Sequence, residues 1–196
     1  MESSATEFST LLHHSKAYKF ASEDTAESLE FFSNFWRDEG AVPIDQRGDT
    51  VLHLLAVKGN VAALGNLLRA DHLLGEMLLI KNASGNTPLH EAARSGQKVV
   101  AEIMVTTKPD LVFQRNDMNE TPLYLSAAFG KREVFTLLES YNSDCRIRRH
   151  DGSTILHAAI EGERYMQMVP MGLKKVRQSN WANNLKTFTL GSRLGN

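Results

Sequence analysis

The sequence predicts an all-α solenoid of helix-turn-helix units, joined by short β-hairpins or turns. Two observations predict it. A four-residue motif, Thr-x-Leu followed by His or Tyr, occurs four times, at residues 50–53, 87–90, 121–124 and 154–157. The Thr residues of successive motifs are 37, 34 and 33 positions apart. A nearly constant period of this length is typical of stacked repeats, each of which buries its apolar face against the next.

Each motif is expected to begin the inner helix of its unit. A Thr hydroxyl at the N-cap accepts a hydrogen bond from a first-turn N–H, and Pro88 and Pro122 follow where a missing N–H costs nothing. Two positions before the Thr, every unit has a residue type that tolerates positive φ. These residues are Gly48, Gly85, Asn119 and Gly152. The sequence therefore predicts a left-handed turn ahead of each inner helix.

An outer helix is expected to follow each inner helix. Gly59, Gly96 and Gly130 lie nine residues after their Thr and predict a left-handed helix stop. Apolar residues then recur at helical spacing and predict the face buried against the next unit. They are Val61, Leu64, Leu67 and Leu68 in the first unit, Val99, Val100, Ile103 and Met104 in the second, and Val134, Leu137 and Leu138 in the third.

The ends of the chain differ from the middle. Residues 1–8 are expected to be disordered, and residues 9–42 to form a degenerate capping repeat. Its second helix is predicted to start at Asp24 or Thr25 and to end at Gly40. Its apolar stripe is Leu29, Phe32, Phe35 and Trp36, interpreted as core with a groove for a partner helix as the alternative. Residues 43–162 hold about four repeats. The last is incomplete, because Gly162 comes one residue early and Pro170 interrupts the outer helix.

Residues 163–196 form a basic tail with a net charge of +5, against −6 for residues 1–162. The tail lacks helical periodicity and is expected to be disordered. One hypothesis is that it comes from a truncated, spliced or frameshifted reading of a longer gene. The other is that Lys174, Lys175 and Arg177 contact phosphate or lipid head groups.

Composition argues against several functional classes. The formal net charge of −1 gives no overall attraction to nucleic acid. Cys145 is the only cysteine, so no intramolecular disulfide can form. The N-terminus lacks the basic and apolar regions of a signal peptide, and no segment approaches 18 consecutive apolar residues. We expect a cytoplasmic protein without a membrane span in this chain.

Catalytic and ligand-binding chemistry is not indicated. His53, His90 and His157 occupy one repeat position, about 8–10 Å apart in successive units, which is too far for one metal ion. Cys145 is expected to be buried, since it stands where Leu78 and Val112 stand in other units. None of the glycines forms a phosphate-binding loop. We therefore expect no enzyme activity, cofactor, metal or small-molecule substrate.

Three stretches of sequence carry a family resemblance: GNTPLHEAARSG at 85–96, NETPLYLSAAFG at 119–130 and GSTILHAAIEG at 152–162. They resemble ankyrin repeats, and the resemblance covers about residues 43–162. They are also similar to plant ankyrin proteins that end in a membrane-spanning PGG domain. The resemblance implies a protein-binding scaffold, with stress or defence signalling as its setting. The alternative is a soluble fragment or isoform of a membrane-anchored regulator at the plasma membrane.

The resemblance further implies that partner proteins bind the hairpin tips and the exposed side of the inner helices. The candidate residues at these variable positions are Arg47, Asp49, Lys58, Asn86, Glu91, Arg94, Met118, Glu120, Leu125, Phe129 and Ser153. Met118 and Phe129 are notable because apolar side chains are favoured at the centre of interfaces. Phe129 could instead fold onto the neighbouring helix. A recurring base at Lys81, Arg115 and Arg148, joined by Arg146 and Arg149 at the fourth hairpin, is either a solvated rim or a contact for an acidic partner.

Overall fold

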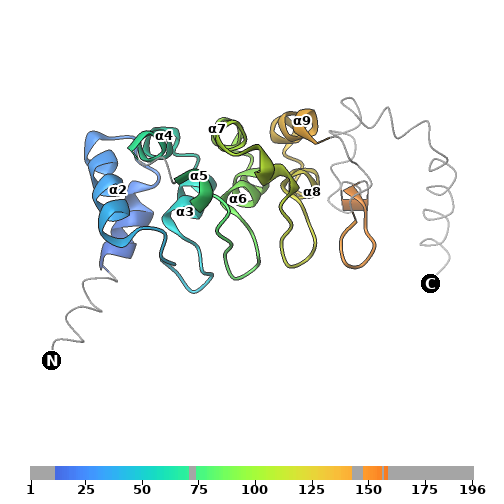
Figure 1. Ribbon diagram of the computed structural model, residues 1–196, viewed down its shortest axis with the longest axis horizontal. Coiled ribbons are helices and arrows are strands. Elements are labelled where there is room, and N and C mark those ends of the chain that lie inside the picture. The colour runs from blue at the N-terminus through green and yellow to red at the C-terminus, as the bar shows by residue number, and fades with distance from the viewer. Residues whose placement is uncertain (1–11, 71–73, 143–147, 156, 159–196) are drawn as a thin grey trace, which may run out of the picture.

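The computed structural model describes residues 12–70, 74–142, 148–155 and 157–158, and its helices stack in two rows (Figure 1). The inner helices are α3 (Val51–Lys58), α6 (Pro88–Ser95) and α8 (Pro122–Ala128). The outer helices of the same units are α4 (Val61–Ala70), α7 (Lys98–Thr107) and α9 (Arg132–Tyr141). Along the stack α3 packs on α6 and α6 on α8, while α4 packs on α7 and α7 on α9. The predicted all-α solenoid is confirmed.

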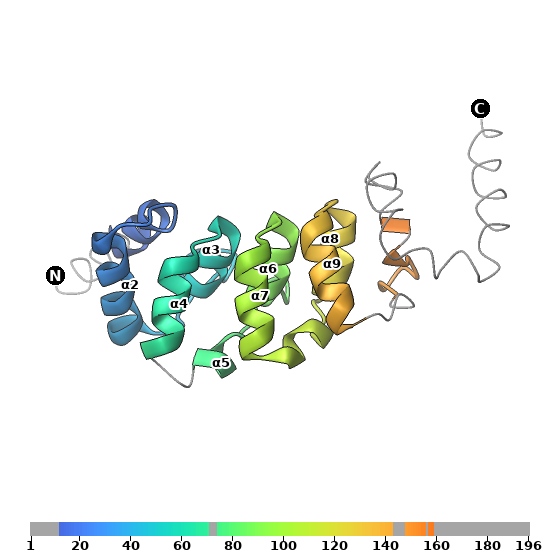
Figure 2. The same ribbon diagram turned by 90° about the horizontal axis from the view of Figure 1, so that it is seen from above.

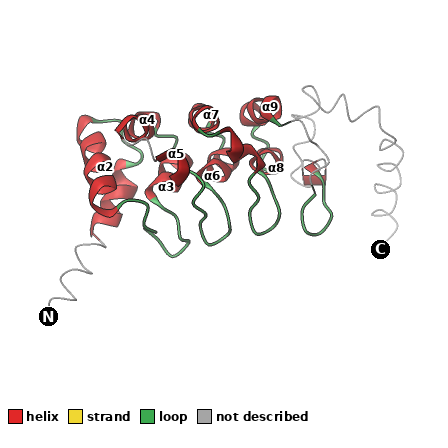
Figure 3. Cartoon of the chain, viewed as in Figure 1, coloured by secondary structure: helices red, strands yellow, loops and turns green. Residues whose placement is uncertain are grey.

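Hairpin loops project from one side of the stack, below the inner helices in Figure 1. Figure 3 shows the described residues as helices and loops, and they contain one isolated antiparallel bridge, between Arg148 and Thr154. Gly48, Gly85 and Gly152 have φ of 70°, 72° and 84°, and Asn119 has φ of 64°. The predicted left-handed turns are therefore present in all four units. Gly59 and Gly96 likewise end α3 and α6 in the left-handed region.

The N-terminal side of the stack is covered by helical residues 12–20 and by α2 (Ala26–Glu39). Thr25 and Ser28 cap the start of α2 reciprocally, and Gly40 ends it, as predicted. Phe32 and Phe35 are buried, and α2 packs on α4 as each outer helix packs on the next (Figure 2). The first face of the array is thus covered by apolar side chains rather than left to solvent.

The buried face of the outer helices differs from the prediction at two positions. Val61 and Val99 were expected in the core and are exposed. The buried residues of α4 are Ala63 and the predicted Leu64 and Leu67. Those of α7 are the predicted Val100 and Met104, together with Ala101 and Val105. At about 100° per residue, Val99 lies almost opposite the centre of its helix's buried stripe. A two-residue Val-Val run cannot say by itself which member faces inward.

Short segments lead from each outer helix to the next hairpin. They are α5 (Leu74–Met77) and the 3₁₀ helix η1 (Pro109–Phe113). Leu78 and Val112 are buried there, as predicted. The predictions for Cys145, for residues 1–8 and for the tail at 163–196 concern residues outside the described part of the chain.

Candidate functional site

A polar residue five positions before the Thr shapes three of the hairpins. These residues are Asp45, Asn82 and Asn116. The Oδ1 atom of Asn116 accepts hydrogen bonds from the backbone N–H groups of Met118 (3.1 Å) and Glu120 (2.9 Å). Asn82 and Asp45 accept the corresponding pairs in their own hairpins. An Asx side chain of this kind fixes a turn by replacing missing backbone contacts.

The same amides join successive hairpins. Asn82 Nδ2 donates to Asp49 Oδ1 at 2.7 Å, and Asn116 Nδ2 donates to Asn86 Oδ1 at 2.8 Å. Backbone hydrogen bonds run in parallel with these side-chain contacts. They join Ala83 N to Arg47 O (2.8 Å), Asp117 N to Ser84 O (3.2 Å) and His150 N to Met118 O (3.2 Å). We call this set of contacts between neighbouring hairpins the hairpin ladder.

The motif histidines add a second link between units. His90 Nδ1 accepts from the backbone N–H of Thr87 (3.1 Å), and its Nε2 lies 3.1 Å from Glu120 O in the next hairpin. Since a backbone N–H can only donate, Nδ1 is unprotonated and Nε2–H is the donor. His53 makes the equivalent contacts to Thr50 and Asn86. Burial lowers the pKa of His90 to about 4 and also lowers the pKa of His53.

The predicted Thr cap takes two forms. The hydroxyl of Thr121 accepts from the N–H of Tyr124 at 3.2 Å, as expected. At Thr50 and Thr87 the histidine takes part, because the hydroxyl lies 3.0 Å and 2.9 Å from its Nδ1. Both ring nitrogens of His53 and of His90 therefore make contacts that hold the fold together. Within the described part of the chain, no three His, Cys, Asp or Glu side chains are grouped as metal ligands.

Several candidate residues expected at the exposed surface are buried. They are Asp49, Asn86, Glu91 and Leu125. Asp49 accepts from Asn82 and pairs with Arg47 at 2.8 Å. Glu91 accepts from Asn86 Nδ2 at 2.9 Å. The polar members are buried because their side chains are parts of the hairpin ladder or brace it.

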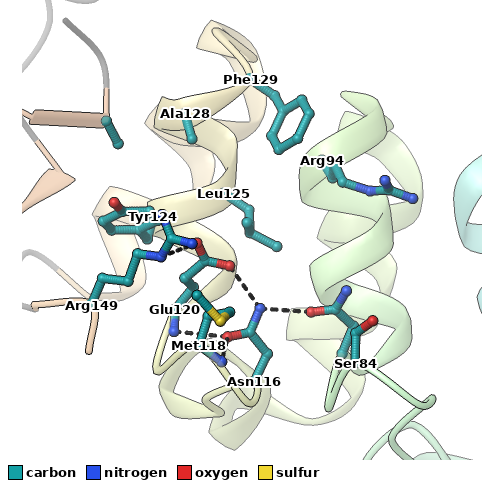
Figure 4. A pocket seen from close by; sticks show the side chains of 12 residues that line it. Ser84, Arg94, Asn116, Met118, Glu120, Tyr124, Leu125, Ala128, Phe129 and Arg149 are labelled. Carbon is teal, nitrogen blue, oxygen red and sulfur yellow. Dashed lines mark hydrogen bonds and ion pairs between the residues drawn. The ribbon is translucent and has the colours of Figure 1, made fainter. Parts of the chain in front are cut away.

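A groove of ≈ 540 Å³ lies between α6, α8 and the fourth hairpin (Figure 4). Six candidate residues line it: Asn86, Arg94, Met118, Glu120, Leu125 and Phe129. The candidates Arg47, Asp49, Lys58, Glu91 and Ser153 do not. Six further lining residues were absent from the candidate set: Ser84, Asn116, Tyr124, Ala128, Arg149 and Ala158. Asn116 and Arg149 share the position five residues before the Thr, and this period could have revealed them.

Two apolar side chains open onto the groove. Met118 is 43% exposed and Phe129 is 40% exposed. The guanidinium carbon of Arg94, on α6, lies 6.0 Å from the centre of the Phe129 ring at the end of α8. This distance is within the range of a cation–π interaction. Phe129 thus combines the two expected behaviours, since it contacts the neighbouring unit and keeps part of its ring accessible.

Arg149 takes the place of the Asx residue in the fourth hairpin. Its Nε lies 3.3 Å from Glu120 Oε1, and its Nη1 lies 3.6 Å from Asp151 Oδ2. The other carboxylate oxygen of Glu120 accepts from Asn116 Nδ2 at 2.8 Å. This ion pair therefore continues the hairpin ladder with a charged group at the groove wall, as Figure 4 shows.

The recurring bases behave as a hairpin rim. Lys81 Nζ donates to Arg115 O at 2.7 Å, one hairpin further along. Arg115 and Arg148 each donate to the carbonyl four residues on, that of Asn119 or Gly152, at 3.2 Å. These contacts are solvent-exposed. They support the interpretation of these bases as a solvated rim.

Comparison with known proteins agrees with this geometry. Residues 84–117 match the family model of the ankyrin repeat. This unit is an ankyrin repeat. The stretch begins within the second hairpin and contains α6, α7 and η1, so the ankyrin match covers one whole period of the stack.

Relatives extend the likeness along the chain. The chain is 31% identical over 116 residues to the transient receptor potential cation channel subfamily A member 1 homolog of Caenorhabditis elegans. The matched region is 59% of this chain and 9% of that relative. A putative ankyrin repeat protein of Rickettsia bellii is 33% identical over 105 residues, 51% of this chain and 62% of its own. The B-cell lymphoma 3 protein homolog of Mus musculus is 28% identical over 125 residues, which are 61% of this chain and 28% of that relative.

The chain thus spans less than two thirds of the length of each of these relatives. Together with the repeat match they support the ankyrin repeat family, whose members are generally non-catalytic modules for protein interaction. In the described part of the chain, no helix has the length and apolar character needed to cross a membrane.

Proposed function

We propose that this protein is a non-catalytic, cytoplasmic interaction module that binds a partner protein in its concave groove. The observation that carries the proposal is the groove itself. Its lining combines the exposed Met118 of the third hairpin with Phe129 at the end of α8 and Arg94 of α6, which contact each other. Apolar anchors and arginines near the centre of a patch supply most of the binding energy in protein interfaces.

The structure refines which candidates should contact the partner. Arg94, Met118 and Phe129 line the groove and are accessible, so we propose them as contacts, with Glu120 and Leu125 as less exposed parts of the groove wall. Asp49, Asn86 and Glu91 would act indirectly by holding the hairpins. The candidates Arg47, Lys58 and Ser153 lie outside the groove, where they can serve only a partner that extends beyond it.

A triple substitution tests the proposal. R94A/M118A/F129A removes the exposed anchors, and K98A is the control, on an exposed residue of the outer helix α7 outside the groove. Proteins captured from cell extract by the unsubstituted chain are identified by mass spectrometry. The proposal expects the triple variant to lose specific partners that K98A retains, with circular dichroism showing that both stay folded. Equal capture by all three proteins contradicts it.

A second candidate is the soluble part of a membrane-anchored regulator in plant stress or defence signalling. It is favoured by the similarity of residues 85–96, 119–130 and 152–162 to plant ankyrin proteins with a PGG domain. The transcript beyond the codon for Glu163 tests it. Further repeats and hydrophobic segments in that reading frame would support this candidate, and a frame without them would remove it.

A further inference from the structure

The ion pairs of the groove expose their two partners unequally. The side chain of Arg94 is 38% exposed and that of its partner Glu91 4%. The side chain of Arg149 is 30% exposed and that of its partner Glu120 13%. The formal charges balance, but the guanidinium groups lie at the surface and the carboxylates beneath them. A ligand in the groove therefore meets the positive side of each pair.

The two carboxylates are held in that lower position. Glu91 accepts from Asn86 through Oε1 and from Arg94 Nε and Nη2 through Oε2, at 2.9, 3.0 and 2.6 Å. Glu120 is held through Oε2 by Asn116 and contacts Arg149 through Oε1. With both oxygens of each group engaged, neither carboxylate can turn outward without losing buried hydrogen bonds.

The guanidinium groups keep capacity for a ligand. A guanidinium has five N–H donors in a planar fork that matches a carboxylate. Among the described residues, the hydrogen bonds of Arg94 use its Nε and Nη2. In the same part of the chain, the ion pairs of Arg149 use its Nε and Nη1. The Nη1 group of Arg94 and the Nη2 group of Arg149 can therefore receive a further anionic group.

The apolar side chains lie between these charges in the chain order of the groove. Arg94 flanks Phe129 across α6 and α8, and Arg149 belongs to the hairpin that follows, whose backbone contacts Met118. The lining runs from Ser84 in the second hairpin to Arg149 in the fourth, two repeat steps. At roughly 8–10 Å a step this is on the order of 20 Å, which about six residues of extended chain would span.

We infer that the groove binds an extended partner segment in which acidic residues flank one large apolar side chain. The inference rests on the proposed function and names its ligand class. The partner's carboxylates contact Arg94 and Arg149, and its apolar side chain packs between Met118 and Phe129. Nucleic acid is disfavoured as occupant, because its phosphates need a run of unpaired cations, and both groove arginines already face a carboxylate.

Selection from a phage-displayed library of random twelve-residue peptides tests the inference. We expect enriched peptides in which Asp or Glu stands next to Leu, Ile, Met or an aromatic residue. A selected peptide, labelled with fluorescein, is then titrated with the chain and its variants. R94Q/R149Q should weaken binding by about tenfold or more, because each lost charge-assisted contact is a strong one. K58Q removes an exposed charge outside the groove and should change affinity by less than about twofold.

Two measurements keep the test independent of folding defects. M118S alters a groove side chain outside the ion pairs and should also weaken binding of the peptide, without loss of the helical circular dichroism signal. Raising the salt concentration should weaken binding to the unsubstituted chain. Enriched peptides without acidic residues, or affinities insensitive to both salt and R94Q/R149Q, overturn the ligand class. If no peptide is enriched while groove-dependent capture of a folded protein persists, the segment inference fails and the proposed function stands.

Discussion

The first three hairpins and the fourth differ at one position, and the difference separates folding from function. Asp45, Asn82 and Asn116 each accept two backbone N–H groups within their own hairpin. In the fourth hairpin Arg149 stands at that position and pairs with Glu120 at the groove wall. Where the position keeps its Asx residue, the side chain accepts N–H groups of its own hairpin. Where Arg149 replaces it, the side chain pairs with Glu120 of the preceding hairpin instead.

The inner helices show the same contrast. His53 and His90 link their units to the next hairpin and are buried. The third unit has Tyr124 at this position, and Tyr124 is also buried but lines the groove. The groove thus lies where the repeat is least regular, beside the last units of the described stack. Four predictions test this division, from the largest expected effect to the smallest.

Acid should destabilise the array through its buried histidines. The folded-state pKa of His90 is about 4, below the ordinary 6.5, so the unfolded chain binds more protons between these values. Stability from this group is therefore present above about pH 6.5 and is lost as the pH falls toward 4, by about 3 kcal/mol in all. Urea unfolding from pH 7 to pH 4.5 measures it.

The contribution of His90 can be isolated by substitution. H90N should be less stable at pH 7 and should show a shallower loss of stability with acid. The control H157N changes the exposed histidine of the fourth unit and should keep the full slope. Parallel profiles for H90N and the unsubstituted chain would contradict the assigned protonation.

Removing the Asx side chain of the third hairpin should lower the free energy of unfolding far more than removing the arginine side chain of the fourth. N116A leaves two backbone N–H groups, and the buried side-chain oxygen Oδ1 of Asn86, without their partner. We expect a loss of about 2–3 kcal/mol in the free energy of unfolding. R149A removes two partly exposed ion pairs, those with Glu120 and Asp151, and should cost under about 1 kcal/mol. Equal losses in urea titrations would remove the distinction between the hairpins.

The tip glycines give a smaller contrast. A Cβ at Gly85 would lie 2.6 Å from the backbone nitrogen of Asp117, whereas a Cβ at Gly152 has no described atom within 4 Å. Both residues have positive φ, so each Ala substitution carries about 1 kcal/mol of backbone strain. G85A should cost at least about 1 kcal/mol more, because overpacking adds to that strain. Thermal unfolding of the two variants side by side measures the difference, and equal midpoints would show that the hairpins are not in close contact.

Restoring the repeat rule in the fourth hairpin should give the smallest change. R149N provides the Asx side chain that the other hairpins use, and should raise stability by about 0.5–1 kcal/mol through turn hydrogen bonds. R149Q, which has an amide too long for that turn, is the matched control and should give no gain. A destabilised R149N would mean that the ion pair with Glu120 matters more to the hairpin than the turn does.

The sequence predicted what depends on local backbone chemistry. The positive φ at Gly48, Gly85, Asn119 and Gly152 followed from residue type, and so did the start of α2 after Thr25. It was less informative about contacts between units. A variable polar position such as Asp49 looks the same in sequence whether it binds a partner or accepts a hydrogen bond from Asn82, 33 residues away.

The groove shows the same limit. Met118, Phe129 and Arg94 stood out because their positions follow no repeat rule, and the structure brings them together. Arg149 was noticed only as a base, because its significance depends on Asn116 standing at the same position one unit earlier. The period of a repeat must be followed residue by residue before its exceptions become informative.

The affinity of R149N for a peptide selected on the unsubstituted chain tests the central claim most directly. The claim is that Arg149, at the position where other hairpins have an Asx residue, contacts the ligand and does not support its own turn. Fluorescence anisotropy should show weaker binding by R149N, while urea titration of the same sample shows equal or greater stability. Unchanged peptide affinity in a folded R149N protein would contradict the claim, since the exception to the repeat would then have no part in binding.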